Sequence, residues 1–120
     1  MTSTMSANLT TRIFDTARNV PAAGVRFQLY WVESRGDVLL RAGATNERGT
    51  TDAALLDPSK LSAGSYKLVL HIGDYFETHN TTAGRLFLDL LPVVFMIDDA
   101  SQPTHVEVRV WPTGYNVERG

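Results

Sequence analysis

Three polar side chains alternate with valines over residues 104–111. His105, Glu107 and Arg109 occupy every second position, and a valine follows each of them. Because successive side chains of an extended strand point to opposite faces, an imidazole, a carboxylate and a guanidinium share one face here. Imidazole titrates near neutral pH, and guanidinium stays charged. The chemistry that this row offers is therefore proton transfer and anion binding.

The same row has a plainer interpretation. Charged side chains on the outer face of a strand are commonly solvated, and they also protect the strand from pairing with other chains. A second strand pattern, at residues 9–15, has Leu9 and Ile13 on one face and Arg12 and Phe14 on the other. Periodicity alone leaves the choice between a site and a solvated face open.

Alternation with a period of two runs through most of the chain and predicts the strands that position these side chains. The expected strands are residues 9–15, 25–32, 38–42, 66–71 and 104–111. Residues 86–97 are also expected to be extended, because Pro92 would break a helix. A short helix fits only residues 73–82. Several short strands at this spacing predict an all-β sandwich.

Composition narrows the class of protein. The 120 residues are 43% hydrophobic and carry 11 basic side chains, 13 acidic side chains and no cysteine. This length suits one domain, which buries roughly two thirds of the surface of its unfolded chain. The basic and acidic side chains are nearly balanced in number, and the sequence lacks the basic stripe that a nucleic-acid-binding protein needs. Without cysteine there is no disulfide framework, thiol nucleophile or cysteine-ligated metal, and we expect no metal and no cofactor.

The N-terminal residues and the densest apolar stretch predict the location of the protein in the cell. Residues 1–8 are small and polar and lack the basic start and apolar core of a secretory signal. The densest apolar stretch, residues 86–97, is interrupted by Asp89 and Pro92 and is shorter than the ~20 residues that a membrane span needs. We expect a disordered tail at residues 1–8, one domain at residues 9–120, a cytoplasmic location and no membrane partner.

Eight short motifs follow one another along residues 9–120. They are TRIFD (11–15), PAAGV (21–25), TNERG (45–49), GSYKL (64–68), DYF (74–76), LPVVF (91–95), THV (104–106) and PTGY with a closing RG (112–120). In this order they resemble the transthyretin-like family, whose enzymatic branch is 5-hydroxyisourate hydrolase. The resemblance implies an eight-stranded sandwich with one short helix. It also implies a homotetramer, a dimer of dimers, whose dimer–dimer channel is lined by the first strand and the strand of His105.

The resemblance extends to some site positions of the hydrolase branch and not to others. The late histidine of that branch is kept as His105, and its closing Arg-Gly is kept as Arg119 and Gly120. Arg12 stands where the branch has a histidine in its first motif, and Thr50 stands where it has an arginine. The polar groups of the channel are therefore partly replaced.

The roles that the resemblance implies must fit these replacements. His105 would be the base that activates water, and Arg12 would bind the developing oxyanion or an anionic substrate. Glu118, which stands where the branch has a tyrosine, or Glu107 would orient His105 or share its proton. The substrate-binding residues implied are Thr50, Glu107, Arg109, Arg119, Gly120 and Phe14.

Three functions remain open at this point. The first is a hydrolase that opens the ring of hydroxyisourate, or of a substituted relative such as an N-methylated one, in urate breakdown. The second is an enzyme of the same fold with a changed substrate or reaction. The third is a binding protein that uses the channel as transthyretin does for hormone. Arg12 is chemically close to the lysine of the carrier branch, whereas His105, which that branch lacks, favours an enzyme.

Overall fold

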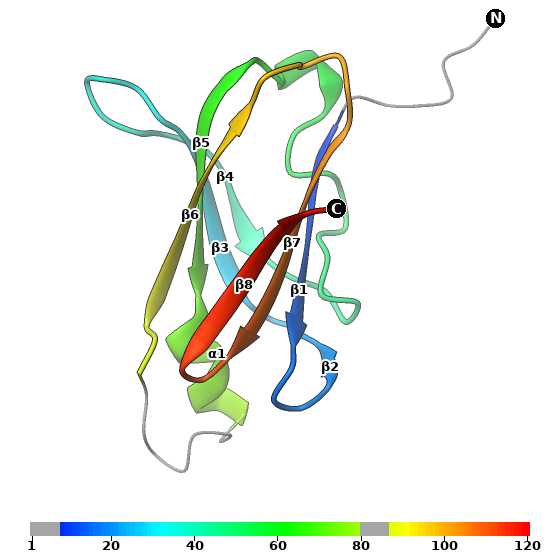
Figure 1. Ribbon diagram of the computed structural model, residues 1–120, viewed down its shortest axis with the longest axis vertical. Helices are drawn as coiled ribbons and strands as arrows, with labels where there is room; N and C mark the ends of the chain where they lie inside the picture. Colours follow the sequence, from blue (N-terminus) through cyan, green and yellow to red (C-terminus); the bar gives the residue numbers. More distant parts are fainter. Residues whose placement is uncertain (1–7, 80–86) are drawn as a thin grey trace, which may run out of the picture.

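The computed structural model describes residues 8–79 and 87–120. These residues form two four-stranded sheets packed face to face, with a short α-helix at one end (Figure 1). The predicted all-β sandwich with eight strands and one short helix is thereby confirmed. Residues 1–7 of the expected tail, and residues 80–82 of the expected helix, lie outside the described residues.

Each sheet combines strands from distant parts of the sequence. The first sheet has the order β2-β1-β7-β8, with β1 at Leu9–Asp15, β2 at Val20–Pro21, β7 at Thr104–Trp111 and β8 at Gly114–Arg119. The second sheet has the order β4-β3-β5-β6, with β3 at Arg26–Trp31, β4 at Val38–Ala44, β5 at Gly64–His71 and β6 at Leu90–Ile97. The helix α1 spans Ile72–His79, and a 3₁₀ turn lies at Pro58–Lys60.

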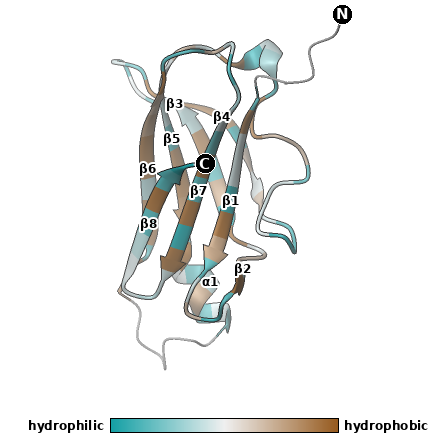
Figure 2. Ribbon diagram, turned by 45° about the vertical axis from the view of Figure 1, so that its right-hand side comes forward, coloured by the Kyte–Doolittle hydropathy of each residue, from teal (hydrophilic) through white to brown (hydrophobic). Residues whose placement is uncertain are grey.

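The core lies between the sheets and follows the predicted alternation. Leu9 and Ile13 of β1 are fully buried, as are Val108 and Val110 of β7. Figure 2 shows the alternation as successive brown and teal bands along β7. Each valine, leucine or isoleucine buried in this way contributes roughly 1.5–3 kcal/mol to folding. The hydrophobic faces of β1 and β7 thereby direct the polar faces of both strands outward.

β1 and β7 are parallel neighbours, and their register determines which outward side chains meet. Thr10 lies opposite His105, Arg12 opposite Glu107 and Phe14 opposite Arg109. On the other side of β7, the antiparallel strand β8 places Glu118 opposite Glu107. Polar residues from three strands are therefore gathered on one outer face.

A buried carboxylate joins the helix to the first sheet. Asp15, at the end of β1, is fully buried and accepts a hydrogen bond of 2.7 Å from the hydroxyl of Tyr75 in α1. It also accepts a hydrogen bond of 3.0 Å from the backbone N–H of Arg18. Burial, and then the hydrogen bond and negative charge of Asp15, raise the pKa of Tyr75 to about 12.

Within the described residues, no helix is both long and apolar enough to cross a membrane.

Candidate active site

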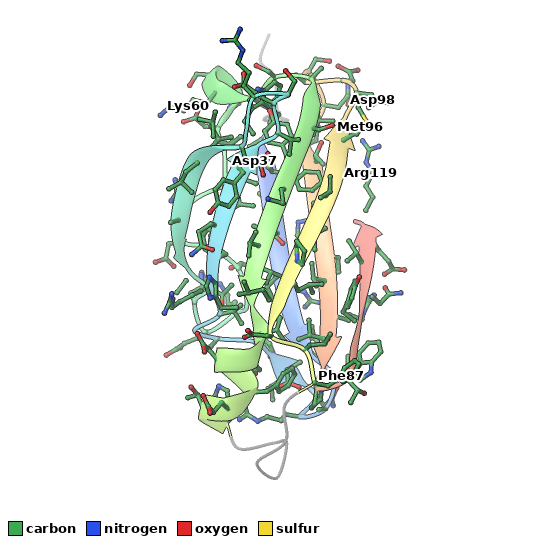
Figure 3. All side chains as sticks on the ribbon, turned by 90° about the vertical axis from the view of Figure 1, so that its left-hand side faces the viewer. Asp37, Lys60, Phe87, Met96, Asp98 and Arg119 are labelled. Carbon is green, nitrogen blue, oxygen red and sulfur yellow. The ribbon has the colours of Figure 1, made fainter. Side chains whose placement is uncertain are left out.

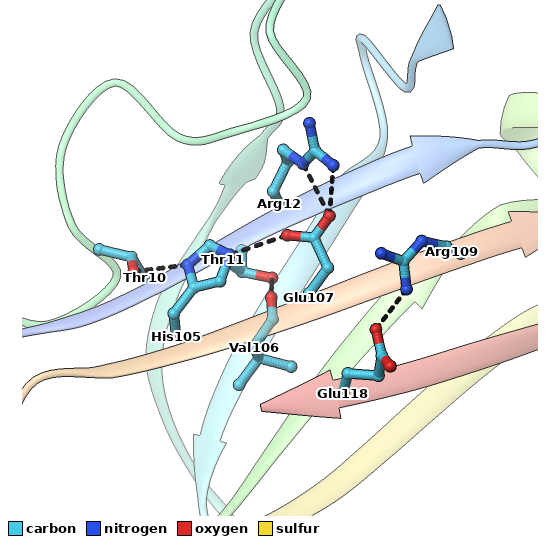
Figure 4. A network of polar contacts seen from close by, with 8 residues as sticks. All are labelled: Thr10, Thr11, Arg12, His105, Val106, Glu107, Arg109 and Glu118. Carbon is cyan, nitrogen blue, oxygen red and sulfur yellow. Dashed lines mark hydrogen bonds and ion pairs between the residues drawn. The ribbon is translucent and has the colours of Figure 1, made fainter. Parts of the chain in front are cut away.

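A continuous chain of hydrogen bonds crosses from β1 to β7 on the outer face (Figure 4). The hydroxyl of Thr10 lies 2.8 Å from Nδ1 of His105. Nε2 of the same imidazole lies 2.9 Å from Oε1 of Glu107. Oε2 of Glu107 accepts a hydrogen bond of 2.7 Å from Nε of Arg12 and forms an ion pair with Nη2 of the same guanidinium at 2.6 Å. Four side chains from two neighbouring strands thus form one network.

The partners of His105 determine which ring nitrogen carries the proton. An ionised carboxylate can only accept hydrogen bonds, so Nε2 must donate to Glu107. In the neutral ring Nδ1 is then the acceptor, and the hydroxyl of Thr10 donates to it. The basic nitrogen of His105 is therefore Nδ1, and it faces Thr10.

Glu107 stays ionised in this network. Burial raises its pKa, but the hydrogen bonds from Arg12 and His105 and the charge of both residues outweigh that effect and lower it. The side chain is mostly covered, with 13% of its surface exposed, whereas that of Arg12 is 39% exposed. Glu107 can therefore both orient His105 and stabilise it when it becomes an imidazolium.

Arg12 is held from two further sides. Its guanidinium carbon lies 5.3 Å from the centre of the Phe14 ring, which is a cation–π distance. Its backbone forms an antiparallel bridge with Thr50. No hydrogen bond joins Nη1 of Arg12 to the residues that the structure describes, so this nitrogen can bind an anion.

A glycine allows the chain to bring Thr50 so close to β1. Gly49 has a φ of +75°, and a Cβ at this position would lie 2.3 Å from the carbonyl oxygen of Ile13. The backbone N–H of Ile13 donates to the carbonyl of Gly49 at 2.8 Å. The hydroxyl of Thr50 itself donates to Oδ1 of Asn46 at 3.1 Å. Thr50 therefore lies beside Arg12, while its hydroxyl bonds its own turn.

A second ion pair lies next to the network. Arg109 of β7 donates a hydrogen bond to the carboxylate of Glu118 in β8. This hydrogen bond, followed by the negative charge of Glu118, raises the pKa of Arg109. Of the two acidic residues expected to orient His105, the structure places Glu107 in contact with the imidazole and pairs Glu118 with Arg109.

Arg119, the last residue of β8, and Gly120, which follows it, have different neighbours. The backbone N–H of Gly120 donates to the carbonyl of His105 at 2.9 Å, and a Cβ on this glycine would lie 2.6 Å from Cδ2 of the imidazole. Arg119 lies opposite Val106, whose side chain faces the core. It lines a cavity of about 110 Å³ together with Met96 of β6, and His105 and Glu118 contribute to the same lining. Figure 3 shows Arg119 and Met96 at the same end of the sandwich.

The structure thus gathers most of the expected site residues and adds one more. Arg12, Phe14, Thr50, His105 and Glu107 form one cluster. Gly120 covers one edge of the imidazole, the Arg109–Glu118 pair is adjacent, and Arg119 lies on the opposite face. The missed residue, Thr10, alternates with Arg12 on the same outward face, and that alternation was the available signal. No group of three or more acidic or histidine side chains placed to hold a metal ion occurs in residues 8–79 and 87–120.

Comparison with known proteins places this chain in a family. The model of the HIUase/Transthyretin family matches residues 9–120. The chain belongs to the HIUase/Transthyretin family. The family expected from the order of the motifs is therefore confirmed.

Individual members of the HIUase/Transthyretin family agree with this assignment. A 5-hydroxyisourate hydrolase of Deinococcus radiodurans is 39% identical over 112 residues, which cover 93% of this chain and 94% of that protein. The structure of Klebsiella pneumoniae 5-hydroxyisourate hydrolase matches with a TM-score of 0.76 at 28% identity, covering 94% of this chain and 97% of the other. Sea bream transthyretin in complex with thyroxine matches with a TM-score of 0.84 at 19% identity, covering 94% of both chains. This last likeness is one of fold, and it confirms the expected transthyretin-like sandwich.

Proposed function

We propose that this protein is a hydrolase that opens the ring of 5-hydroxyisourate, or of a substituted relative such as an N-methylated one, in the breakdown of urate. The observation that carries the proposal is the His105–Glu107 contact. It fixes an imidazole with its basic nitrogen on the outer face, in a chain that is 39% identical to a 5-hydroxyisourate hydrolase. Hydrolysis of a cyclic amide needs such a base, together with a group that stabilises the oxyanion.

The roles in this reaction follow from the hydrogen bonds of each side chain. His105 accepts the proton of the attacking group at Nδ1 and later returns it to the leaving nitrogen. Glu107 keeps the tautomer fixed and stabilises the imidazolium. Arg12 presents Nη1 to the carbonyl oxygen on which negative charge develops. Thr50 and Phe14 line this part of the site beside Arg12.

We also propose that the protein acts as a homotetramer built as a dimer of dimers. The support is the apolar surface along the free edges of β6 and β8, where the exposed fraction is 63% for Val94, 71% for Met96 and 48% for Tyr115. A groove of about 340 Å³ runs between the same two edges. Unpaired strand edges with apolar side chains are ready to pair with another copy. In such an assembly the outer face of the first sheet would face another pair of subunits, and the small-molecule substrate would bind between them.

The direct test generates 5-hydroxyisourate in place with a urate-oxidising enzyme and follows its ultraviolet decay. We expect the purified protein to accelerate the decay and His105→Ala to abolish the acceleration. A tyrosine on the opposite sheet, Tyr30→Phe, controls for handling of the variants. If the wild-type protein leaves the spontaneous rate unchanged for both hydroxyisourate and its N-methylated relatives, the proposal is wrong.

One observation favours a binding protein as the second candidate. Both nitrogens of His105 and two nitrogens of Arg12 are already bonded within the chain, so the network can act as a fixed polar wall for a ligand. Calorimetric titration with urate-like and other anionic ring compounds separates the two candidates. Tight binding without any turnover would support the carrier and contradict the hydrolase.

A further inference from the structure

The hydroxyl of Thr10 completes a catalytic arrangement that the proposed function does not by itself require. We propose that Thr10 is the nucleophile of this hydrolase and forms a covalent acyl intermediate through Oγ1. This inference rests on the proposed function, because it names the group that attacks the ring carbonyl. It treats Thr10, His105 and Glu107 as a nucleophile, its base and the carboxylate that orients the base.

The order and the distances of the three groups carry the inference. The hydroxyl oxygen of Thr10 lies 2.8 Å from Nδ1 of His105, and Nε2 lies 2.9 Å from Oε1 of Glu107. A hydroxyl bonded to a base that a third group orients is the geometric signature of an activated nucleophile. Figure 4 shows the three side chains following one another from β1 to β7 in this order.

The polarity of the hydrogen bonds points in the direction that activation needs. Ionised Glu107 accepts from Nε2, so Nδ1 of neutral His105 carries the lone pair and Thr10 is the donor. When the hydroxyl gives up its proton, the positive charge that forms on His105 lies next to the carboxylate of Glu107. Arg12 keeps that carboxylate ionised through a hydrogen bond from Nε and an ion pair from Nη2, both to Oε2.

The hydroxyl of Thr10 also occupies the position beside Nδ1 of His105 that a water molecule activated by this base would need. Both ring nitrogens of His105 already have protein partners, and the one that can accept a proton is bonded to Thr10. A water molecule could reach Nδ1 only by displacing this hydroxyl. The nearest proton for the base is therefore that of Thr10.

The backbone holds the two reacting groups rigidly. Thr10 and His105 are register partners in the central strand pair of the first sheet. The backbone N–H of Leu9 in β1 donates a hydrogen bond to the carbonyl of Leu56. On the other side, the backbone N–H of Gly120 donates to the carbonyl of His105 at 2.9 Å. Side chains on paired strands keep their geometry better than side chains on loops. Arg12 lies two residues along the same face, and no hydrogen bond joins its Nη1 to the residues that the structure describes.

The reaction balances with water as the sole co-reactant. Oγ1 of Thr10 bonds the ring carbonyl carbon while its proton passes to Nδ1 of His105. The carbon–nitrogen bond of the ring then breaks, and the ring nitrogen takes the proton from Nδ1. A water molecule next attacks the resulting ester and gives one proton to Nδ1. The ester bond to Oγ1 breaks, the proton returns to Thr10, and the opened product leaves as the acid.

The hydroxyl of the neighbouring threonine, Thr11, has a structural role. Thr11 is buried and donates at 2.7 Å to the backbone carbonyl of Val106. It therefore supports the strand pair and has no base to activate it. Thr11→Ser is a matched control for Thr10 variants, since it keeps this hydroxyl on the same strand.

The test combines acyl trapping with kinetics. We incubate the protein with p-nitrophenyl acetate and locate any acetyl group by peptide mass mapping. We expect acetylation of Thr10 in the wild type and in Thr11→Ser, and none in Thr10→Val or His105→Ala. With hydroxyisourate, we expect Thr10→Val to lose about 10²–10⁴-fold in kcat, and Thr10→Ser to stay within about tenfold of the wild type.

The outcomes distinguish this inference from the proposed function. If Thr10→Val hydrolyses hydroxyisourate at the wild-type rate while His105→Ala is inactive, water is the nucleophile and the inference is wrong, although the function stands. If wild type does not accelerate hydroxyisourate decay but acetylates at Thr10, the proposed substrate is wrong and the nucleophile stands. If neither hydrolysis nor acetylation occurs in a folded protein, both are wrong.

Discussion

Nε2 of His105 lies 2.9 Å from Oε1 of Glu107, two residues further along the same strand. Residues i and i+2 of a strand share a face, so the contact needs no long-range fold to form. What the fold adds is the parallel neighbour β1, which brings Thr10 to the other nitrogen and Arg12 to the other carboxylate oxygen. The contacts of this His105–Glu107 pair therefore come from two strands.

Replacing Glu107 with glutamine keeps the shape of the side chain and removes its charge. We expect Glu107→Gln to lower kcat by about 10²-fold, because the tautomer of His105 is no longer fixed and its imidazolium is no longer stabilised. The free energy of unfolding should fall by about 1 kcal/mol, because Arg12 loses its charged partner and solvent screens part of that interaction at a half-buried guanidinium. Initial rates of hydroxyisourate decay and urea unfolding measure the two effects.

The pH dependence of the same variant gives a second test. The lowered pKa of Glu107 means that its ionised form is favoured in the folded protein. Its contribution to stability is therefore complete above the ordinary glutamate range, near pH 4.3, and is lost as the pH falls through the lowered value. The difference in stability between wild type and Glu107→Gln should shrink on acidification. Glu118→Gln, which removes the partner of Arg109, should affect kcat much less, and an equal loss would contradict the role given to Glu107.

The strands of the site were predictable from the sequence, and their pairing was not. Alternation over residues 9–15 and 104–111 gave strands with the bounds of β1 and β7, because each buries one apolar face. The bond between Thr10 and His105 joins residues 95 positions apart, and nothing local encodes a parallel register. For this reason the alternation placed Thr10, Arg12 and Glu107 on outward faces but could not show that Thr10 meets His105.

The last strand was harder to interpret for a different reason. Tyr115 and Val117 are exposed apolar residues at a free edge, so hydrophobicity does not mark which face of β8 points inward. The pairing with β7 settles it, since it places Glu118 opposite Glu107 and Arg119 opposite Val106. Glu118 consequently shares the outer face with the network, and Arg119 faces the other way.

Gly49 is predicted to be essential for both stability and the site. In Gly49→Ala the new Cβ would lie 2.3 Å from the carbonyl oxygen of Ile13 at a φ of +75°. Strain of this backbone costs roughly 1–3 kcal/mol, and the clash adds to it by pushing Thr50 away from Arg12. Gly24→Ala is the matched control, because its φ is +78° and a Cβ there meets nothing within 4 Å. Thermal unfolding should show the larger loss for Gly49→Ala, and equal losses would show that the close approach to Ile13 does not matter.

Tyr75 should make the protein sensitive to alkali. Its pKa is raised to about 12, so the folded state favours the protonated phenol. The stability that it contributes is complete below about pH 10 and is lost as the pH rises toward 12, by roughly 2 kcal/mol in all. Tyr75→Phe removes this titration and the hydrogen bond to buried Asp15, so it should be less stable than wild type at neutral pH.

The measurement is urea unfolding of wild type and Tyr75→Phe at neutral pH and near pH 11. The gap between the two proteins should narrow at the higher pH, because only the wild type has the phenol of Tyr75 to ionise. Tyr115→Phe, at a position that is 48% exposed, should follow the wild type at both values. A gap that stays constant would mean that ionisation of Tyr75 does not limit alkaline stability.

The free edge of β6 should control assembly. Met96 is 71% exposed there, and a lysine in its place would bring charge into any pairing of this edge with another copy. We expect Met96→Lys to give a smaller species than wild type in light scattering after size exclusion, and to lose activity because the proposed tetramer channel would no longer form. Leu39→Lys is the matched control, since Leu39 is 55% exposed on β4, the opposite edge of the same sheet. Assembly through β6 and β8 predicts that Leu39→Lys keeps the wild-type size, and dissociation by Leu39→Lys with no change in Met96→Lys would place the subunit interface at β4 instead.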